Sequence, residues 1–291
     1  MITIFTPTYN REQELSVLYD SLLKQNNMDF FWAVVDDGSQ DNTRAFINKI
    51  EKTSPFKIIY HYQKNAGKHT AINWLLDNCT TQFAICVDSD DYLSPNAVTV
   101  LNEYANKYKQ KPYWAIVGPR FSMKEGIKNW NVTMEKSILF STIYTHYKYK
   151  GETFMLWNLD LFDGIRFPIF DGEKFLPESA IYDILDMKAH VIVCNDTIYI
   201  SDYQGDGLTM NSKSSFVRNR KGYATANLIS SMNTNRSIMD RSLSYARYCA
   251  IKKRITNNFE VANDKDVGTI IRCVGSAIGI PLSLFYSIQG K

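Results

Sequence analysis

The sequence has few of the features that would tie it to nucleic acid, to secretion or to a disulfide framework. Its formal net charge is only +3, which is too small to indicate a nucleic-acid partner. The five cysteines are odd in number and widely spaced, without a CxxC pair, so neither disulfides nor a zinc site are expected. The N-terminus lacks the basic segment and long apolar run of a signal peptide. We therefore expect a cytoplasmic protein.

Glycine-rich phosphate loops are absent as well. The segment 6–11, which follows the first predicted strand, contains no glycine. This excludes the G-x-G-x-x-G motif of dinucleotide oxidoreductases. The Gly67-Lys68 pair lacks the spacing of a Walker A loop. If the protein binds a nucleotide, other groups must hold it.

The composition is that of an ordinary globular protein, with 45% hydrophobic and 22% charged residues. The first hundred residues alternate apolar runs with helical spacing. Strands are predicted at 2–5, 31–35, 57–62 and 83–87, and helices at 11–26, 41–52, 68–78 and 95–108. This order predicts an α/β fold with a mostly parallel central sheet flanked by helices. Ligands bind such sheets beyond the carboxyl ends of the strands.

The second half of the chain is less regular. Strands are predicted at 115–118, 191–194 and 197–200, and helices at 178–189 and over the basic stretch 215–259. The apolar segment 267–288 contains Arg272 and Pro281 and is too interrupted to predict a membrane span. An interfacial segment, or one packed against a partner, fits it better.

An acidic cluster, Asp88-Ser89-Asp90-Asp91, directly follows an apolar strand. Carboxylates at this density repel one another unless a cation compensates their charge. Mg²⁺ and Mn²⁺ prefer oxygen ligands and are often shared between carboxylates and substrate phosphates. Asp88 and Asp90 therefore predict metal or nucleotide binding, whereas Asp91 is equally compatible with a solvated turn.

Two more polar turns are expected at the same edge of the sheet. In Asp36-Asp37-Gly38-Ser39, one aspartate is a candidate turn former and Asp37 a candidate acceptor for a nucleobase or ribose. Asn65-Ala66-Gly67-Lys68 leads into a predicted helix, whose first amides, together with Lys68, would suit a phosphate.

These motifs, in this order, resemble the donor-binding half of family 2 glycosyltransferases, which have the GT-A fold and invert the anomeric configuration. The residues that carry the resemblance are Thr6-Pro7-Thr8-Tyr9-Asn10-Arg11, Val35–Thr43, Asn65–Lys68 and Val87–Asp91. Residues 172–178 and 203–209 resemble a branch of the same family. The resemblance is strong over about residues 1–100 and weaker beyond.

The resemblance implies a site for a nucleotide-sugar, commonly a UDP-sugar. The implied donor-binding residues are Thr6, Pro7, Tyr9, Arg11, Asp37, Lys68, Asp88 and Ser89. Asp37 would meet the base, Lys68 the diphosphate and Asp88 the ribose. Asp90 would bind the Mn²⁺ or Mg²⁺ that bridges the diphosphate.

The resemblance also implies a catalytic base at the start of the predicted helix 178–189. Many relatives have a Glu-Asp pair there, whose aspartate removes the proton of the acceptor; here the pair is Glu178-Ser179. Glu178 is the predicted base, and Asp183 is the alternative. A purely structural role for Glu178, as a negative charge at a helix N-terminus, is the competing interpretation.

The expected enzyme is thus an inverting, metal-dependent glycosyltransferase of bacterial surface-polysaccharide biosynthesis, acting on a glycan or lipid-linked glycan. A non-catalytic nucleotide-sugar-binding module and another nucleotide-sugar enzyme, such as a pyrophosphorylase, are the alternatives. We expect a catalytic domain at 1–214, with a nucleotide-sugar-binding half (1–110) and an acceptor-binding half (111–214). The helical extension 215–291 either touches the inner face of the cell membrane or caps the catalytic domain.

Overall fold

The computed structural model describes residues 1–201, 212–255 and 266–278. The chain divides into two compact units, each described here by itself. Unit 1 comprises residues 1–164 and 189–205, and unit 2 comprises residues 165–188 and 206–291. The predicted motif at 203–209 and part of the apolar segment 267–288 lie outside the described residues.

Unit 1 contains the sheets. Its elements in chain order are β1 (Ile2–Thr8), α1 (Glu12–Leu23), β2 (Phe30–Asp36), α2 (Thr43–Ile50), β3 (Lys57–Tyr62), α3 (Lys68–Asn78), β4 (Phe83–Cys86), β5 (Asp91–Leu93), α4 (Ala97–Tyr108), β6 (Tyr113–Pro119), β7 (Phe121–Ser122), β8 (Ser137–Ile138), α5 (Phe140–Thr145), β9 (Thr153–Asn158), the 3₁₀ helix η1 (Leu159–Phe162), β10 (His190–Val193) and β11 (Tyr199–Ser201).

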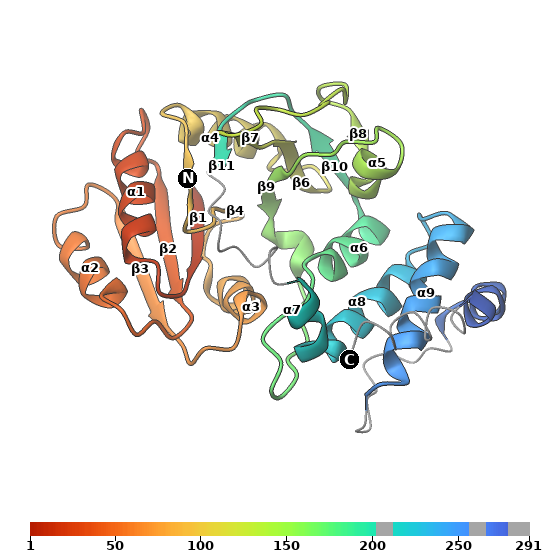
Figure 1. Ribbon diagram of the computed structural model, residues 1–291. Coiled ribbons are helices and arrows are strands. Elements are labelled where there is room, and N and C mark those ends of the chain that lie inside the picture. The colour runs from red at the N-terminus through yellow and green to blue at the C-terminus, as the bar shows by residue number, and fades with distance from the viewer. Residues whose placement is uncertain (202–211, 256–265, 279–291) are drawn as a thin grey trace. The chain divides into compact units, whose positions relative to one another are not determined.

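The main sheet has eight strands in the order β3-β2-β1-β4-β9-β6-β10-β8 (Figure 1). β9 runs antiparallel to both of its neighbours, β4 and β6, and β8 runs antiparallel to β10. The remaining pairs are parallel. A second sheet has three strands in the order β5-β11-β7. The predicted mostly parallel α/β fold is confirmed, and β9 is a strand that the sequence did not predict.

The core of unit 1 explains why its first half was predictable. β1 and β2 are buried along nearly their whole length, as strands covered on both faces must be. α1 buries one face, with Leu15, Leu18 and Leu22 at helical spacing. Tyr19 on the same helix stacks on Trp32 of β2, with ring centroids 5.9 Å apart.

In the described part of unit 2 the regular elements are helices, and residues 165–178 form a non-helical segment before them. Its elements are α6 (Ser179–Lys188), α7 (Ser212–Arg218), α8 (Arg220–Met232) and α9 (Ile238–Lys252). α8 and α9 share an apolar core that includes Leu228, Tyr248 and Ile251. The predicted C-terminal helices are therefore confirmed.

The predicted domain division at residues 214 and 215 stays a prediction. In the structure, residues 165–188 cluster with the C-terminal helices and not with the sheet, although the prediction placed them in the catalytic domain 1–214. Within 1–201, 212–255 and 266–278, none of the helices combines the length and hydrophobicity that a membrane span requires.

Candidate functional site

The carboxyl ends of β1, β2 and β4 lie side by side in unit 1. The amide of Asp37, just after β2, donates to the Thr8 carbonyl of β1 across 2.8 Å. The amide of Val87, just after β4, donates to the Phe5 carbonyl of β1, also across 2.8 Å. Since these three strands are parallel, the turns that follow them meet at one sheet edge. This arrangement brings the predicted donor-binding motifs together.

The carboxylate of Asp37 binds the loop that precedes α3. Its Oδ1 accepts hydrogen bonds from Gln63 Nε2 at 2.7 Å and the Ala66 amide at 2.8 Å, and its Oδ2 accepts one from the Gly67 amide at 2.7 Å. The side chain is buried. Asp37 therefore fixes the shape of the loop, a role that the sequence analysis missed. The predicted contact with a nucleobase stays a prediction.

Two glycines permit this close packing of loops. Gly67 has φ of 99° and Gly38 has φ of 88°, a region that favours glycine. A Cβ on Gly38 would lie 2.8 Å from the backbone nitrogen of Asn65. The turn after β2 and the loop before α3 are thus in direct backbone contact.

Asp88, just after β4, is held by two cations. Lys68 Nζ at the start of α3 lies 2.7 Å from Asp88 Oδ1, and Arg120 Nη1 lies 3.4 Å from Asp88 Oδ2. Burial would raise the pKa of this carboxyl, but the charges of Lys68 and Arg120 outweigh burial and hold the pKa at about 2. Asp88 is therefore ionised at neutral pH.

Arg120 and Tyr199 both contact the acidic cluster 88–91. The Arg120 guanidinium lies over the Tyr199 ring, with Cζ 4.0 Å from the centroid. The Tyr199 hydroxyl donates to Asp91 Oδ2 at 2.7 Å and accepts from the Asp88 amide at 3.0 Å. Arg120 Nη1 also lies 3.3 Å from Asp91 Oδ2. Asp91 is a buried partner in this network and not a solvated turn residue.

Neither residue was predicted from the sequence, although a signal for Arg120 exists. Arg120 directly follows β6, and β6 runs in the same direction as β4 because both are antiparallel to β9. A residue at the carboxyl end of β6 therefore belongs to the same sheet edge as Asp88. Tyr199 carries no comparable signal, because β11 belongs to the small second sheet.

Asp90 differs from its neighbours in having no ion pair among the described residues. Burial raises the pKa of its carboxyl, and the charge of Asp88 raises it further, while Arg11 and Lys68 act in the opposite direction. A cation beside Asp90 would relieve this repulsion. No cluster of three or more His, Cys, Asp or Glu side chains within the described ranges is arranged to hold a metal.

Thr6, Pro7 and Ser89 are less accessible than the resemblance implies. Thr6 Oγ1 is fully buried and accepts a hydrogen bond from Trp32 Nε1 at 3.0 Å. Ser89 is buried, and Pro7 is partly exposed near the end of β1. Thr6 therefore supports the strand in this structure, and direct donor contacts by these residues stay predictions.

The turn after β1 is more open. Tyr9 is 46% exposed, and Arg11 pairs with Glu14 through an Nη1–Oε1 distance of 2.7 Å. Asn10 has a φ of 51°, and its backbone amide donates a hydrogen bond to Ser39 Oγ at 2.8 Å. This bond ties the first turn to the turn after β2.

The two candidate bases lie in unit 2. Glu178 directly precedes α6, and its Oε2 accepts a hydrogen bond from Tyr182 at 2.6 Å. Asp183 is buried, and its carboxylate is bound by Arg236 Nε at 2.7 Å, Asn233 Nδ2 at 2.8 Å and Ser230 Oγ at 2.5 Å. Both oxygens of Asp183 are engaged in joining α6 to α8 and the segment after it. The assignment of either residue as the base stays a prediction.

The segment before Glu178 is fixed to the start of α8. Glu173 accepts hydrogen bonds from the amides of Lys221 and Gly222, each at 2.9 Å. Asn219 Oδ1 accepts from the amides of Lys174 at 2.8 Å and Phe175 at 3.0 Å. This arrangement satisfies N-terminal amides of α8 and places Glu178 on a defined backbone.

Comparison with known proteins identifies the family of this arrangement. The family model described as Glycosyl transferase family 2 matches residues 3–163. Glycosyltransferase GlyA of Streptococcus pneumoniae is 27% identical over 214 residues, which are 68% of this chain and 30% of the relative. A Campylobacter jejuni GalNAc(5)-diNAcBac-PP-undecaprenol beta-1,3-glucosyltransferase is 24% identical over 256 residues, covering 86% of this chain and 79% of the relative. The chain spans between 28% and 38% of the length of three curated relatives, including GlyA.

Solved structures show the same fold. Staphylococcus aureus TarS 1–349 in complex with UDP-GlcNAc matches with a TM-score of 0.66 at 18% identity, covering 100% of this chain and 92% of that one. The mannosyltransferase PcManGT of Pyrobaculum calidifontis, in complex with GDP-Man and Mn²⁺, matches with a TM-score of 0.56 at 14% identity, covering 99% and 83%. The predicted GT-A fold is thereby confirmed.

Proposed function

The chain belongs to glycosyl transferase family 2, and on that premise we propose that it transfers a sugar from a UDP-sugar to a hydroxyl group of a glycan or lipid-linked glycan. The transfer inverts the anomeric configuration, depends on Mn²⁺ or Mg²⁺, and serves the synthesis of a bacterial surface polysaccharide. The name of the Campylobacter relative, which describes a glucosyltransferase acting on a lipid-linked glycan, supports this acceptor class. The UDP-GlcNAc complex of TarS supports the donor class.

The observation that carries the proposal is the ionised Asp88 between Lys68 and Arg120 at the sheet edge. A carboxylate that stays ionised can accept hydrogen bonds from ribose hydroxyls. Lys68 lies 2.7 Å from Asp88, so its ammonium group is also within the site and can offset the charge of a diphosphate. The exposed ring of Tyr9 lies on the adjacent turn, where it can border the base.

The residues present fit a divalent metal at Asp90. Its carboxylate is partly buried beside the charge of Asp88, without an ion pair among the residues described, and hard cations prefer such oxygen ligands. Diphosphate oxygens would complete the ligand set. When bound, the metal supplies Lewis-acid stabilisation of the leaving nucleoside diphosphate. The presence of Mn²⁺ with GDP-Man in PcManGT supports this assignment.

The protein groups then perform a single displacement. The acceptor oxygen attacks the anomeric carbon, and the bond between that carbon and the diphosphate oxygen breaks with inversion. Glu178 takes the proton of the acceptor hydroxyl, and the electron pair of the broken bond leaves with UDP. Lys68 stabilises the charge that develops on the diphosphate. General-base assistance of this kind contributes about a hundred- to ten-thousand-fold in rate.

A non-catalytic nucleotide-sugar-binding module is the second candidate, because Ser179 occupies the usual position of the base. Release of UDP from a panel of UDP-sugars, with glycan acceptors and with or without Mn²⁺, separates the two. We expect Mn²⁺-dependent release that falls at least about a hundredfold in Glu178→Gln, while UDP affinity is unchanged. Donor binding without release by the wild type would identify a binding module. Undiminished release by Glu178→Gln would remove Glu178 as the base.

We also propose that α9 contacts an anionic membrane surface, where a lipid-linked acceptor would lie. Ile238 and Met239 are 61% and 67% exposed, and Arg247, Lys252 and Lys253 on or next to the same helix are exposed. Exposed apolar and basic side chains together are typical of interfacial helices. Vesicles rich in phosphatidylglycerol should sediment the wild type but less of Ile238→Ser/Met239→Ser, with Val17→Ser as the matched control. Equal sedimentation of all three proteins would contradict this proposal and favour a capping role.

A further inference from the structure

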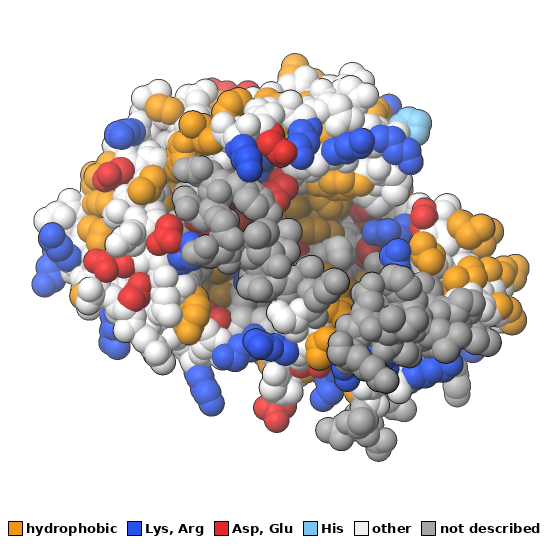
Figure 2. Space-filling model, in the orientation of Figure 1, with side chains coloured by type: hydrophobic (Ala, Val, Ile, Leu, Met, Phe, Trp, Pro, Cys, Tyr) orange, Lys and Arg blue, Asp and Glu red, His pale blue; other side chains and the backbone are white. Residues whose placement is uncertain are grey.

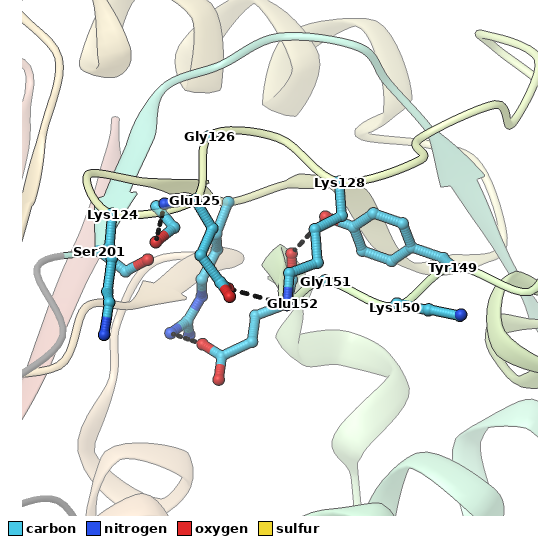
Figure 3. A pocket seen from close by; sticks show the side chains of 11 residues that line it. Lys124, Glu125, Gly126, Lys128, Tyr149, Lys150, Gly151, Glu152 and Ser201 are labelled. Atoms are coloured by element: carbon cyan, nitrogen blue, oxygen red, sulfur yellow. Dashed lines mark hydrogen bonds and ion pairs between the residues drawn. The ribbon is translucent and has the colours of Figure 1, made fainter.

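A pocket in unit 1 lies next to the acidic cluster, and none of the predicted donor-binding residues lines it. Its volume is about 350 Å³, and its lining includes Arg120, Lys124, Glu125, Lys128, Lys150 and Glu152. The lining comes from the β7 region, from the loop after β7 and from the segment before β9 (Figure 3). A volume of this size suits one sugar unit or another small group.

Cations outnumber acids in this pocket. The six charged lining residues include four basic and two acidic side chains. Each acid already faces a cation, because Glu125 lies 2.8 Å from Lys128 Nζ and Glu152 lies 3.4 Å from Arg120 Nη1. Figure 3 shows Lys124 and Lys150 on opposite sides of the pocket, with Glu125 and Glu152 between them. Two lysines therefore remain to attract an anion.

Lys124 and Lys150 form no ion pair within the described part of the chain, and both are exposed. Lysine and arginine side chains also gather along the upper part of the face shown in Figure 2, over the segment between β7 and β8. A flexible lysine presents a compact positive charge with three donors, which suits phosphate or carboxylate oxygens. An anionic group is the ligand chemistry that this lining favours.

The second sheet fixes the distance between the pocket and the donor site. Ser201 of β11 pairs with Asp91 of β5 on one side and with Ser122 of β7 on the other. Neighbouring strands lie about 4.8 Å apart, so Ser122 in the pocket wall is about 10 Å from the backbone of Asp91. Arg120 also connects the two places directly, since the same Nη1 contacts Asp88, Asp91 and Glu152. A group bound in the pocket is therefore close to the donor.

We propose that this pocket binds a phosphate or carboxylate group of the acceptor, so that the enzyme acts on an anionic glycan. The proposal rests on the proposed transferase function, because it places the anionic group beside the hydroxyl that receives the sugar. Lys124 and Lys150 provide the attraction. The compensated pairs Lys128–Glu125 and Arg120–Glu152 form the wall between them.

Calorimetric binding of small anions to the full chain tests the pocket, with UDP and Mn²⁺ present to fill the donor site. The probes are glucose 1-phosphate, glucuronate and, as the neutral control, glucose. We expect the wild type to bind one or both anions but not glucose. Glucose 1-phosphate alone would indicate a phosphate-bearing acceptor, and glucuronate alone a carboxylate-bearing one. Lys124→Ala/Lys150→Ala should weaken anion binding by at least about tenfold.

The matched control is Lys52→Ala/Lys111→Ala, which removes two exposed lysines elsewhere in unit 1 and should bind the anions like the wild type. UDP titration of each variant separates this proposal from the proposed function. Loss of anion binding with intact UDP binding supports the pocket. Equal anion binding by Lys124→Ala/Lys150→Ala and the wild type, no anion binding by the wild type, or equal binding of glucose would overturn it. Failure of UDP to bind the wild type would instead contradict the donor assignment.

Discussion

Lys68 Nζ lies 2.7 Å from Asp88 Oδ1, joining the first residue of α3 to the carboxylate that follows β4. The bond connects two of the predicted donor-binding motifs and leaves Asp88 ionised, with its pKa at about 2. Lys68 therefore has two effects at this site. It stabilises the ionised form of Asp88 and places a positive charge where a diphosphate is expected.

Replacing Lys68 should accordingly weaken donor binding more than loss of a surface charge would. We expect Lys68→Met to lower the affinity for UDP by about 10- to 100-fold, the usual range for a hydrogen bond to a charged group. Lys64→Met, at an exposed position in the preceding loop, is the matched control. Calorimetric titration of UDP in the presence of Mn²⁺ measures the difference. Equal affinities for the two variants would exclude Lys68 from the donor site.

Arg120 should be important for stability as well as for function. Its side chain is 16% exposed and is the shared partner of Asp88 and Asp91, so Arg120→Met leaves the buried Asp91 without its cation, while Asp88 keeps Lys68. We expect the free energy of unfolding to fall by about 3 kcal/mol, as measured by urea denaturation. Arg44→Met, on the exposed surface of α2, should change it by less than about 0.5 kcal/mol. A similar small change for Arg120→Met would show that solvent replaces its charge.

Gly222 should tolerate no side chain. A Cβ there would lie 2.3 Å from the carbonyl oxygen of Phe175, in the segment that leads to Glu178. We expect Gly222→Ala to cost about 1–3 kcal/mol of unfolding free energy and to lower sugar transfer while UDP affinity stays unchanged. Gly268→Ala is the control, since nothing lies within 4 Å of its added Cβ. Unchanged transfer by a stably folded Gly222→Ala would show that this backbone contact does not determine the position of Glu178.

Stability should depend on pH through His69 of α3. Burial lowers the pKa of this imidazole, while the charge of Asp37 raises it less. Unfolding exposes the ring, whose ordinary pKa is about 6.5, so the unfolded chain binds a proton that the folded chain does not. The free energy of unfolding should therefore fall as the pH drops below about 6.5.

Urea denaturation at pH 7.5 and 5.5 measures this effect. The decrease in unfolding free energy between the two pH values should be smaller in His69→Gln than in the wild type. His146→Gln, at an exposed position, should retain the wild-type decrease. An identical decrease in all three proteins would show that His69 does not contribute.

Local patterns were sufficient to predict the donor half of unit 1. β3 and α3 have the predicted bounds. The buried strands β1 and β2 appear in the sequence as apolar runs, and the turn at 36–39 marks the end of β2. The edge location of Asp37, Lys68 and Asp88 then followed from the parallel order of the strands.

Contacts distant in sequence were not predictable in the same way. β9 enters the sheet between β4 and β6 from a stretch without clear period, so its pairing depends on tertiary packing. Tyr199 meets Asp91 across 108 residues, and Asp183 meets Arg236 across 53. The sequence presents each of these as an isolated polar residue. The role of Tyr199 in supporting Asp88, and that of Asp183 in joining helices, can be recognised only when their partners are known.

The most direct test of the donor assignment is calorimetric titration of UDP, with Mn²⁺ or with EDTA, into the wild type, Asp90→Asn and the exposed control Asp163→Asn. We expect the wild type and Asp163→Asn to bind UDP more tightly with Mn²⁺ than with EDTA. Asp90→Asn should lose that difference, because an uncharged amide is a much weaker ligand for a hard divalent cation than a carboxylate. UDP binding that is equally tight with Mn²⁺ and EDTA in the wild type, or no UDP binding at all, would contradict a metal-dependent UDP-sugar site at Asp88 and Asp90.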